Sequence, residues 1–188
     1  MSNQTFNFYY DPTRQGYDLN TWSTLSGAPV VVANHLSLGN SEIIHFADLL
    51  RGDLSMSIGI DAPAAGDAKQ FGFMEHNKDA HLTFKVVDDV LTAESSDGVT
   101  VYSQEIDWDA DWSNVDTVFR IKWEPGIASF YINGQLKATF SNTFSLGVPT
   151  IVIPGDTMSV YLSNNANSAL LLNYFEVLGI QSSNLEVL

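Results

Sequence analysis

The sequence predicts an all-β protein in which two antiparallel sheets pack face to face as a β-sandwich. Short segments of alternating apolar and polar residues recur along most of the 188 residues, and they end at Gly, Pro, Asn or Asp. The segment 118–140 is the clearest example, because the tight turns Pro125-Gly126 and Asn133-Gly134 divide it into three such strands. No segment carries the apolar period of about 3.6 residues that marks a helix of ordinary length. Many short strands with this turn chemistry are typical of a sandwich.

The three strands of this segment are predicted to form a meander. Phe119, Ile121 and Trp123 alternate with more polar residues, which is the two-residue period of a strand with one buried face. Asn133-Gly134 is the strongest hairpin signal in the chain, because both central residues of a type I′ turn need positive φ.

The remaining strands are predicted from the same two signals, alternation and turn residues. They fall at 5–10, 29–33, 35–38, 41–46, 54–60, 70–75, 82–87, 90–93, 99–102, 151–153, 158–162 and 169–178. The segment 13–27 reads as a long connection, and 47–52 is compatible with one helical turn that ends at Gly52.

The stretch Phe-Arg-Ile-Lys-Trp-Glu-Pro-Gly-Ile-Ala-Ser-Phe-Tyr-Ile-Asn-Gly-Gln-Leu at 119–136 resembles a hairpin of the concanavalin A-like jelly rolls. That superfamily includes laminin-G-like domains and the laminarinase and lichenase glucanases. The resemblance implies one jelly-roll domain over residues 1–188. It does not select a function, because the fold serves lectins, hydrolases and structural modules alike.

Composition excludes several classes of partner and site. The net charge is −14, from 22 acidic and 8 basic residues, which argues against nucleic acid and against anionic membranes. No apolar run approaches the length of a membrane span. The chain has no cysteine, so disulfides, zinc–thiolate sites and thiol nucleophiles are excluded.

The first residues show no basic segment followed by an apolar one, so the sequence predicts no signal peptide. Synthesis in the cytoplasm is therefore expected. An external site of action, on a virion or a cell surface, would require lysis, a larger particle or a longer parent chain.

The glucanase branch of the superfamily carries a Glu-Ile-Asp-x-Glu strand, and Glu105-Ile-Asp-Trp-Asp is similar to it. In that branch the outer carboxylates act as nucleophile and general acid/base, with the Asp between them as an orienting group. Here Asp109 replaces the last Glu, and it lies only ten residues before Phe119, closer than the family spacing.

The family spacing points instead to the strand 82–87. Alternate positions there hold His81, Thr83 and Lys85, and no carboxylate stands on either face of that strand. The sequence therefore predicts no catalytic residues and a protein that is not an enzyme.

Calcium is the one metal that the sequence suggests, through Asp107, Asp109 and Asp111. Their alternate spacing resembles the start of a calcium loop. Trp112 and Val118 occupy the positions where an EF-hand needs Gly and Glu, so that motif is excluded, while a looser calcium site and a solvated acidic loop both stay open.

Glycan recognition is the predicted function, because aromatic faces and planar polar groups suit sugars. The candidate ligand-binding residues are Tyr102, Trp108, Trp112 and Asn133. The expected setting is an adhesion or structural module on a virion or cell-surface appendage.

Two alternatives remain. One is a phage decoration or other assembly protein that acts through subunit contacts as a homo-oligomer or within a virion; the apolar run 140–151 could supply such a contact. The other is a β-glucanase-like glycoside hydrolase, active or degenerate.

Overall fold

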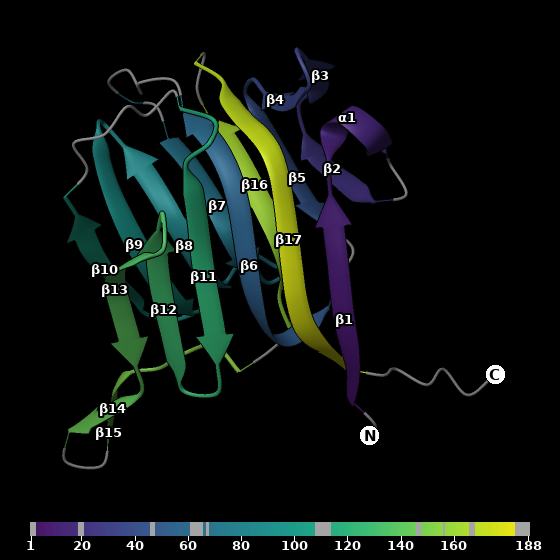
Figure 1. Ribbon diagram of the computed structural model, residues 1–188. Helices are drawn as coiled ribbons and strands as arrows, with labels where there is room; N and C mark the ends of the chain where they lie inside the picture. Colours follow the sequence, from purple (N-terminus) through teal and green to yellow (C-terminus); the bar gives the residue numbers. More distant parts are fainter. Residues whose placement is uncertain are drawn as a thin grey trace.

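The structure is a computed structural model and describes residues 3–18, 21–45, 48–60, 66, 68–107, 114–145, 148–155, 157–165 and 168–182. Over these residues the chain is almost entirely β, with a single four-residue helix, α1 (Pro12–Gln15). Asp11 caps this helix by accepting a hydrogen bond from the Thr13 backbone N–H. The described strands form two large antiparallel sheets, as the sequence predicts (Figure 1).

The first sheet, sheet A, has the strand order β13-β12-β11-β6-β17-β4-β3, and β1 pairs with β17 beside β4. Its strands are β1 (Asn3–Tyr10), β3 (Val30–Val32), β4 (His35–Leu38), β6 (Leu49–Ile60), β11 (Val118–Glu124), β12 (Ile127–Ile132), β13 (Gln135–Ser141) and β17 (Leu170–Ser182).

The second sheet, sheet B, has the order β10-β9-β8-β7-β16-β5-β2. Its strands are β2 (Trp22–Ser26), β5 (Ser41–His45), β7 (Ala68–Met74), β8 (Ala80–Val87), β9 (Val90–Asp97), β10 (Val101–Ile106) and β16 (Ser159–Asn165). A small hairpin of β14 (Thr143–Ser145) and β15 (Val148–Ile151) projects from one end.

The predicted meander is confirmed as β11-β12-β13. Phe119, Ile121 and Trp123 are buried, and their neighbours on β11 face outward. Asn133 and Gly134 have φ of 49° and 78°, as a type I′ turn requires. The Asn133 side chain also accepts a hydrogen bond from the Val118 backbone N–H, so it ties the turn to the start of β11.

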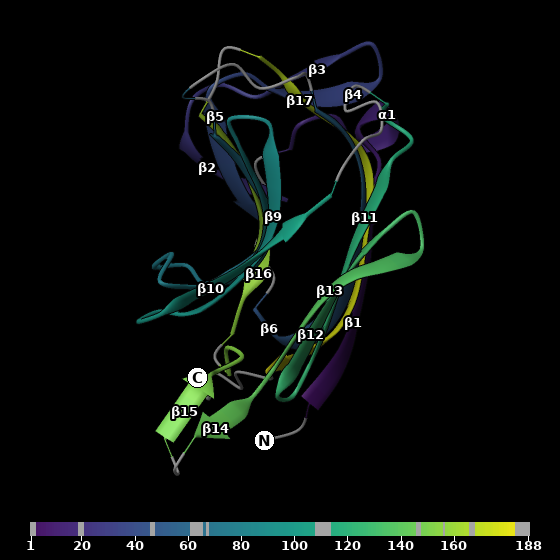
Figure 2. The ribbon, with the colours of Figure 1, turned by 90° about the vertical axis from the view of Figure 1, so that its left-hand side faces the viewer.

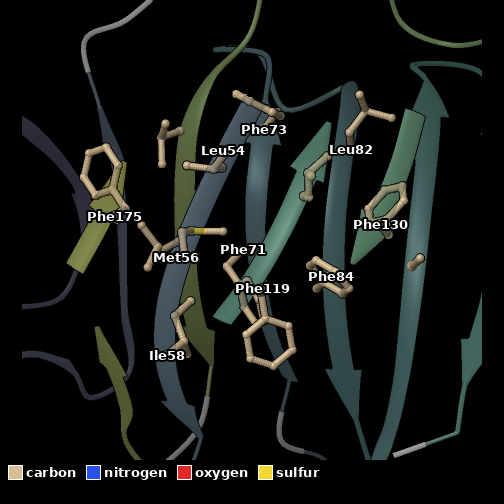
Figure 3. Packing of buried hydrophobic residues seen from close by; sticks show 14 of the residues in the cluster. Leu54, Met56, Ile58, Phe71, Phe73, Leu82, Phe84, Phe119, Phe130 and Phe175 are labelled. Atoms are coloured by element: carbon tan, nitrogen blue, oxygen red, sulfur yellow. The ribbon is translucent and has the colours of Figure 1, made fainter. Parts of the chain in front are cut away.

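The core lies between the sheets and is rich in aromatic rings (Figure 3). Phe119 of sheet A meets Phe71 and Phe84 of sheet B edge-on, at centroid separations of 5.0 and 5.1 Å. Phe130 packs on Phe84 in the same way. Edge-to-face pairs suit the ring quadrupole, so this interleaving fixes how the two sheets sit on each other.

Several local predictions need correction. The segment 13–27, predicted as a long connection, contains β2, which pairs with β5 at the edge of sheet B. The segment 47–52 holds the start of β6 at Leu49 instead of a helical turn, because Leu49 pairs with both Met158 and Gln181. β9 continues to Asp97, beyond its predicted end at Ala93. The strand predicted at 169–178 contains a register shift between Leu172 and Tyr174. Leu172 and Phe175 therefore both lie in the core, although simple alternation would put them on opposite faces.

Sheet B is curved, and its hollow side faces away from sheet A (Figure 2). Each sheet therefore has one face in the core and one face turned outward. The outer face of sheet B is hollow, whereas the outer face of sheet A is the broad surface seen in Figure 1.

Candidate functional site

The candidate site lies on the hollow outer face of sheet B. Strand pairing sets outward-facing residues of all seven strands side by side in rows. The first row is Ser103, Glu94, Thr83, Gly72, Tyr161, Ile44 and Ser23. The second row is Glu105, Thr92, Lys85, Gln70, Ser163, Glu42 and Ser26, and every one of its members is polar.

Glu94 is the central charged group of this face. It stands on β9 and is only 7% exposed although it points away from the core. Its carboxylate lies 3.4 Å from Lys85 Nζ and 3.6 Å from His81 Nε2, both on the neighbouring strand β8. Burial alone would raise the pKa of Glu94, but attraction to His81 and Lys85 outweighs burial, so the pKa lies below its usual value. Glu94 is therefore an anion at neutral pH.

His81 is the second unusual group. Its side chain is 9% exposed, and both ring nitrogens are buried without a hydrogen-bond partner among the described residues. The 3.6 Å separation between Nε2 and the Glu94 carboxylate is slightly too long for a hydrogen bond. Leaving a buried polar atom unpaired costs about 1–3 kcal/mol, and such groups in native proteins call for an explanation.

Glu105 brings a second carboxylate to the same region. It is exposed on β10 and pairs with Thr92, while Glu94 pairs with Ser103, so the two glutamates are diagonal neighbours on one face. Diagonal Cα atoms in a sheet lie about 7–8 Å apart. Two glutamate side chains at this spacing can bring their carboxyls within the range of about 5–9.5 Å that glycosidases use.

Glu42 on β5 is too far away to join this pair. Four strand spacings separate it from Glu94, or about 19 Å. It accepts a hydrogen bond from Tyr161 and forms an ion pair with Lys78. Burial and the bond to Glu42 raise the pKa of Tyr161. Glu42 and Tyr161 line a hollow of about 280 Å³ farther along the same face.

Gly72 leaves the middle of the face without a side chain. Its φ is 148°, and an added Cβ would lie 2.4 Å from the Leu82 carbonyl oxygen. Only glycine fits this backbone, because the added Cβ would also lie 2.8 Å from Ile121 Cδ1 in the core between the sheets. It lies between Thr83 and Tyr161 in the first row.

The ligand-binding residues predicted from the sequence are not brought together within the described part. Tyr102 is partly buried and packs against the core cluster, on the inner side of β10. Asn133 lies in the β12–β13 turn of the other sheet, where its hydrogen bond to Val118 holds the turn. Trp108 and Trp112 lie outside the described residues.

The predicted calcium site stays a prediction. Asp107 is exposed just after β10, and Asp109 and Asp111 fall outside the described residues. Within the part of the chain that the structure covers, no group of three or more His, Asp or Glu side chains could hold a metal ion. Nor does any helix in that part have the length and apolar character to cross a bilayer.

The fold is shared with carbohydrate-related proteins of known structure. No protein-family model matches the sequence, and no curated protein matches it. A β-glucanase of Bacillus licheniformis is 14% identical, with a TM-score of 0.66 over 91% of this chain and 97% of its own. The Crh5 transglycosylase is 13% identical, with a TM-score of 0.75 over 95% and 85%. The Emp47p carbohydrate recognition domain is 9% identical, with a TM-score of 0.63 over 90% and 93%.

These similarities establish the concanavalin A-like jelly-roll fold, as the sequence predicts. They contradict the prediction that the chain is not an enzyme, because most of the similar solved structures are glucanases, a laminarinase or a transglycosylase. The physical reason for the error is visible in sheet B. The family spacing points to β8, which carries no carboxylate, whereas Glu94 stands on the adjacent strand β9 and faces the same side of the sheet.

Sequence reasoning missed Glu94 because it ended this strand at Ala93. Leu91, Ala93 and Ser95 are all buried toward the core, so alternation alone would have placed Glu94 outward if the strand had been continued. The pairing of β8 with β9 sets His81 and Lys85 beside Glu94. The sequence contains only indirect signals of which strands pair with each other.

Proposed function

We propose that this chain is a carbohydrate-active enzyme of the glycoside hydrolase class whose glycan lies along the outer face of sheet B. The observation that carries the proposal is Glu94, a nearly buried anion beside a buried imidazole that lacks hydrogen-bond partners in the described residues. Perturbed ionisable groups with unsatisfied neighbours are typical of functional sites. The carbohydrate-active enzymes among the similar structures support the choice of a sugar substrate.

The face suits a sugar polymer for two reasons. The second row offers hydroxyl, amide, ammonium and carboxylate groups in sequence, which are the partners that sugar hydroxyls need. The seven strands of sheet B span about 29 Å from one edge of the sheet to the other, which is long enough for several sugar units. A hydroxyl of the bound sugar would satisfy His81, which removes the cost of its unpaired nitrogens.

Glu94 and Glu105 are the proposed catalytic pair. Glycoside hydrolysis needs one ionised carboxylate, as nucleophile or base, and one carboxyl that protonates the leaving oxygen. Glu94 suits the first role because Lys85 and His81 hold it as an anion. Glu94 would bond to the anomeric carbon as Glu105 donates its proton to the departing glycosidic oxygen. Water, giving its proton to Glu105, would then attack the same carbon and release the sugar from Glu94.

The experiment measures release of reducing ends from β-1,3- and β-1,3-1,4-glucans. We expect activity in the unaltered chain, and a loss of about 10²–10⁴-fold in Glu94→Gln and in Glu105→Gln. The matched control is Glu124→Gln, which makes the same change on sheet A and should leave the rate unaltered.

Calorimetry with a glucan oligosaccharide separates binding from cleavage. Glu94→Gln should still bind the oligosaccharide, whereas His81→Phe should weaken binding by roughly tenfold, since one hydrogen bond of about 1.4 kcal/mol is lost. Equal rates in Glu94→Gln and the unaltered chain would contradict the assigned pair. No release of reducing ends from either glucan, with purified folded protein, would contradict hydrolysis of this substrate class.

A further inference from the structure

The outer face of sheet A is a second surface whose composition differs from the rest of the chain. Figure 1 looks directly onto it, and none of the described elements crosses in front of β12, β11, β6, β17 or β1. Strand pairing places one row of residues across six strands: Tyr9, Glu176, Ser55, Arg120, Tyr131 and Leu136.

This face carries no net charge in its centre. Two hollows of about 230 and 270 Å³ adjoin at Asp53 and Leu178. Six charged side chains line them: Arg51, Asp53, Arg120, Lys122, Glu124 and Glu176. Three are basic and three acidic, so they cancel, whereas the whole chain carries −14.

Ion pairs within the chain hold most of these charged side chains in place. Arg120 Nε donates to Asp53 Oδ1 at 2.7 Å, and the second guanidinium nitrogen engages the other carboxylate oxygen. Lys122 lies 3.1 Å from Glu124. Side chains that are paired in advance lose less conformational freedom when a partner binds.

Aromatic and apolar side chains lie among these ion pairs. Tyr9 is 48% exposed and stacks on Tyr174 at 5.8 Å, while the Arg120 guanidinium lies 5.4 Å from the centre of the Tyr131 ring. Leu178 is 45% exposed. Exposed tyrosine and arginine with scattered apolar area is the composition enriched at protein–protein interfaces.

We infer that the outer face of sheet A binds the same face of a second copy of this chain, back to back. Two copies that each carry −14 repel one another through most of their surface, but not through a face whose charges cancel. Charges of both signs on one face also allow unlike charges of the two copies to meet across a two-fold axis.

The available area is sufficient for such a contact. Six strands span about 24 Å and some six residues along each strand cover about 20 Å. The contact would therefore bury roughly 1,000 Å², summed over the two copies, which is the size at which specific interfaces begin. A back-to-back pair leaves the hollow face of sheet B open in both copies, so the inference does not depend on the proposed hydrolase activity.

Sedimentation equilibrium tests the inference with the full chain. We expect the mass to rise with concentration from 20.7 kDa toward twice that value. Arg51→Glu puts an excess negative charge on both halves of the interface and should weaken association by about tenfold or more. Tyr9→Ser removes exposed aromatic area from the same face and should also weaken it.

The matched control is Arg14→Glu, which makes the same charge change at a largely exposed residue of α1. It should associate like the unaltered chain. A mass of one chain at all concentrations up to about 1 mM would overturn the inference. A dimer that Arg51→Glu and Tyr9→Ser leave as stable as before would overturn it too, since the contact would then lie elsewhere.

Discussion

His45 shows how burial alone can set the chemistry of a residue. It lies on the inner side of β5 among Phe8, Trp22 and Phe175, with ring centroids 4.5–5.6 Å away. Burial lowers the pKa of His45 to about 4, because no water can solvate the imidazolium there. His81 is also buried, but it faces outward beside Glu94. The same residue type thus belongs to the core in one sheet position and to the candidate site in another.

The lowered pKa of His45 predicts an acid-sensitive stability. Above pH 6.5 the imidazole is neutral in both the folded and the unfolded chain, so this contribution is fully present. As the pH falls from 6.5 to about 4 the unfolded chain takes up the proton first, and the free energy of unfolding should drop by on the order of 3 kcal/mol.

Urea unfolding at a series of pH values measures this effect. His45→Phe should be less sensitive over that window, whereas His76→Gln, which removes an imidazole whose side chain is 53% exposed, should follow the unaltered chain. The same drop in His45→Phe as in the unaltered chain would contradict the assignment.

At the scale of the element, β7 and β9 decide the shape of the candidate site. β9 carries Glu94 in its middle because the strand extends to Asp97. β7 contributes Gly72, whose backbone no other residue can adopt without strain. Alternation explains which residues of these strands face outward, but it does not explain which strands lie next to each other.

Gly72→Ala should destabilise the fold strongly. The new Cβ would meet the Leu82 carbonyl oxygen at 2.4 Å and Ile121 Cδ1 at 2.8 Å, at a φ of 148°. We expect the free energy of unfolding to fall by about 2–4 kcal/mol, from backbone strain and overpacking together. Thermal or urea unfolding measures it. Gly155→Ala is the control, since nothing lies within 4 Å of its Cβ position, and a Gly72→Ala variant as stable as that control would refute the strained geometry.

At the scale of the whole molecule, charge and architecture are distributed unevenly. The acidic excess gives a net charge of −14, yet the centre of the outer face of sheet A is neutral and Lys85 stands beside Glu94 in sheet B. The two outer faces differ in shape, although the same alternation builds both.

The net charge predicts that salt stabilises the folded chain. Raising the ionic strength from about 0.01 to 0.15 M shortens the Debye length from about 30 to 8 Å, which screens the repulsion among acidic groups. We expect the melting temperature to rise by a few degrees. For a protein of this size, a gain of about 1 kcal/mol in the free energy of unfolding raises the melting temperature by roughly 2–4 °C. An uncharged solute at the same osmolality is the control. A melting temperature that falls with salt would show that ion pairs such as Arg120–Asp53 outweigh the repulsion.

Local chemistry was enough to predict most strands of the sandwich and the Asn133-Gly134 hairpin, but not β2 or the full length of β10. Alternation and positive φ are properties of neighbouring residues, so a single sequence contains them. The limits of β9 and the bulge in β17 could not be predicted in this way, because contacts with other strands set them.

The candidate site was decided by tertiary structure. His81 and Glu94 are thirteen residues apart, and Glu105 is farther still along the chain, but antiparallel pairing sets all three on one curved face. Strand order, register and curvature arise from packing over the whole sheet, and burial then leaves both His81 ring nitrogens without a hydrogen-bond partner among the described residues. The sequence by itself determined which residues could face outward, and only the folded sheet determined which of them meet.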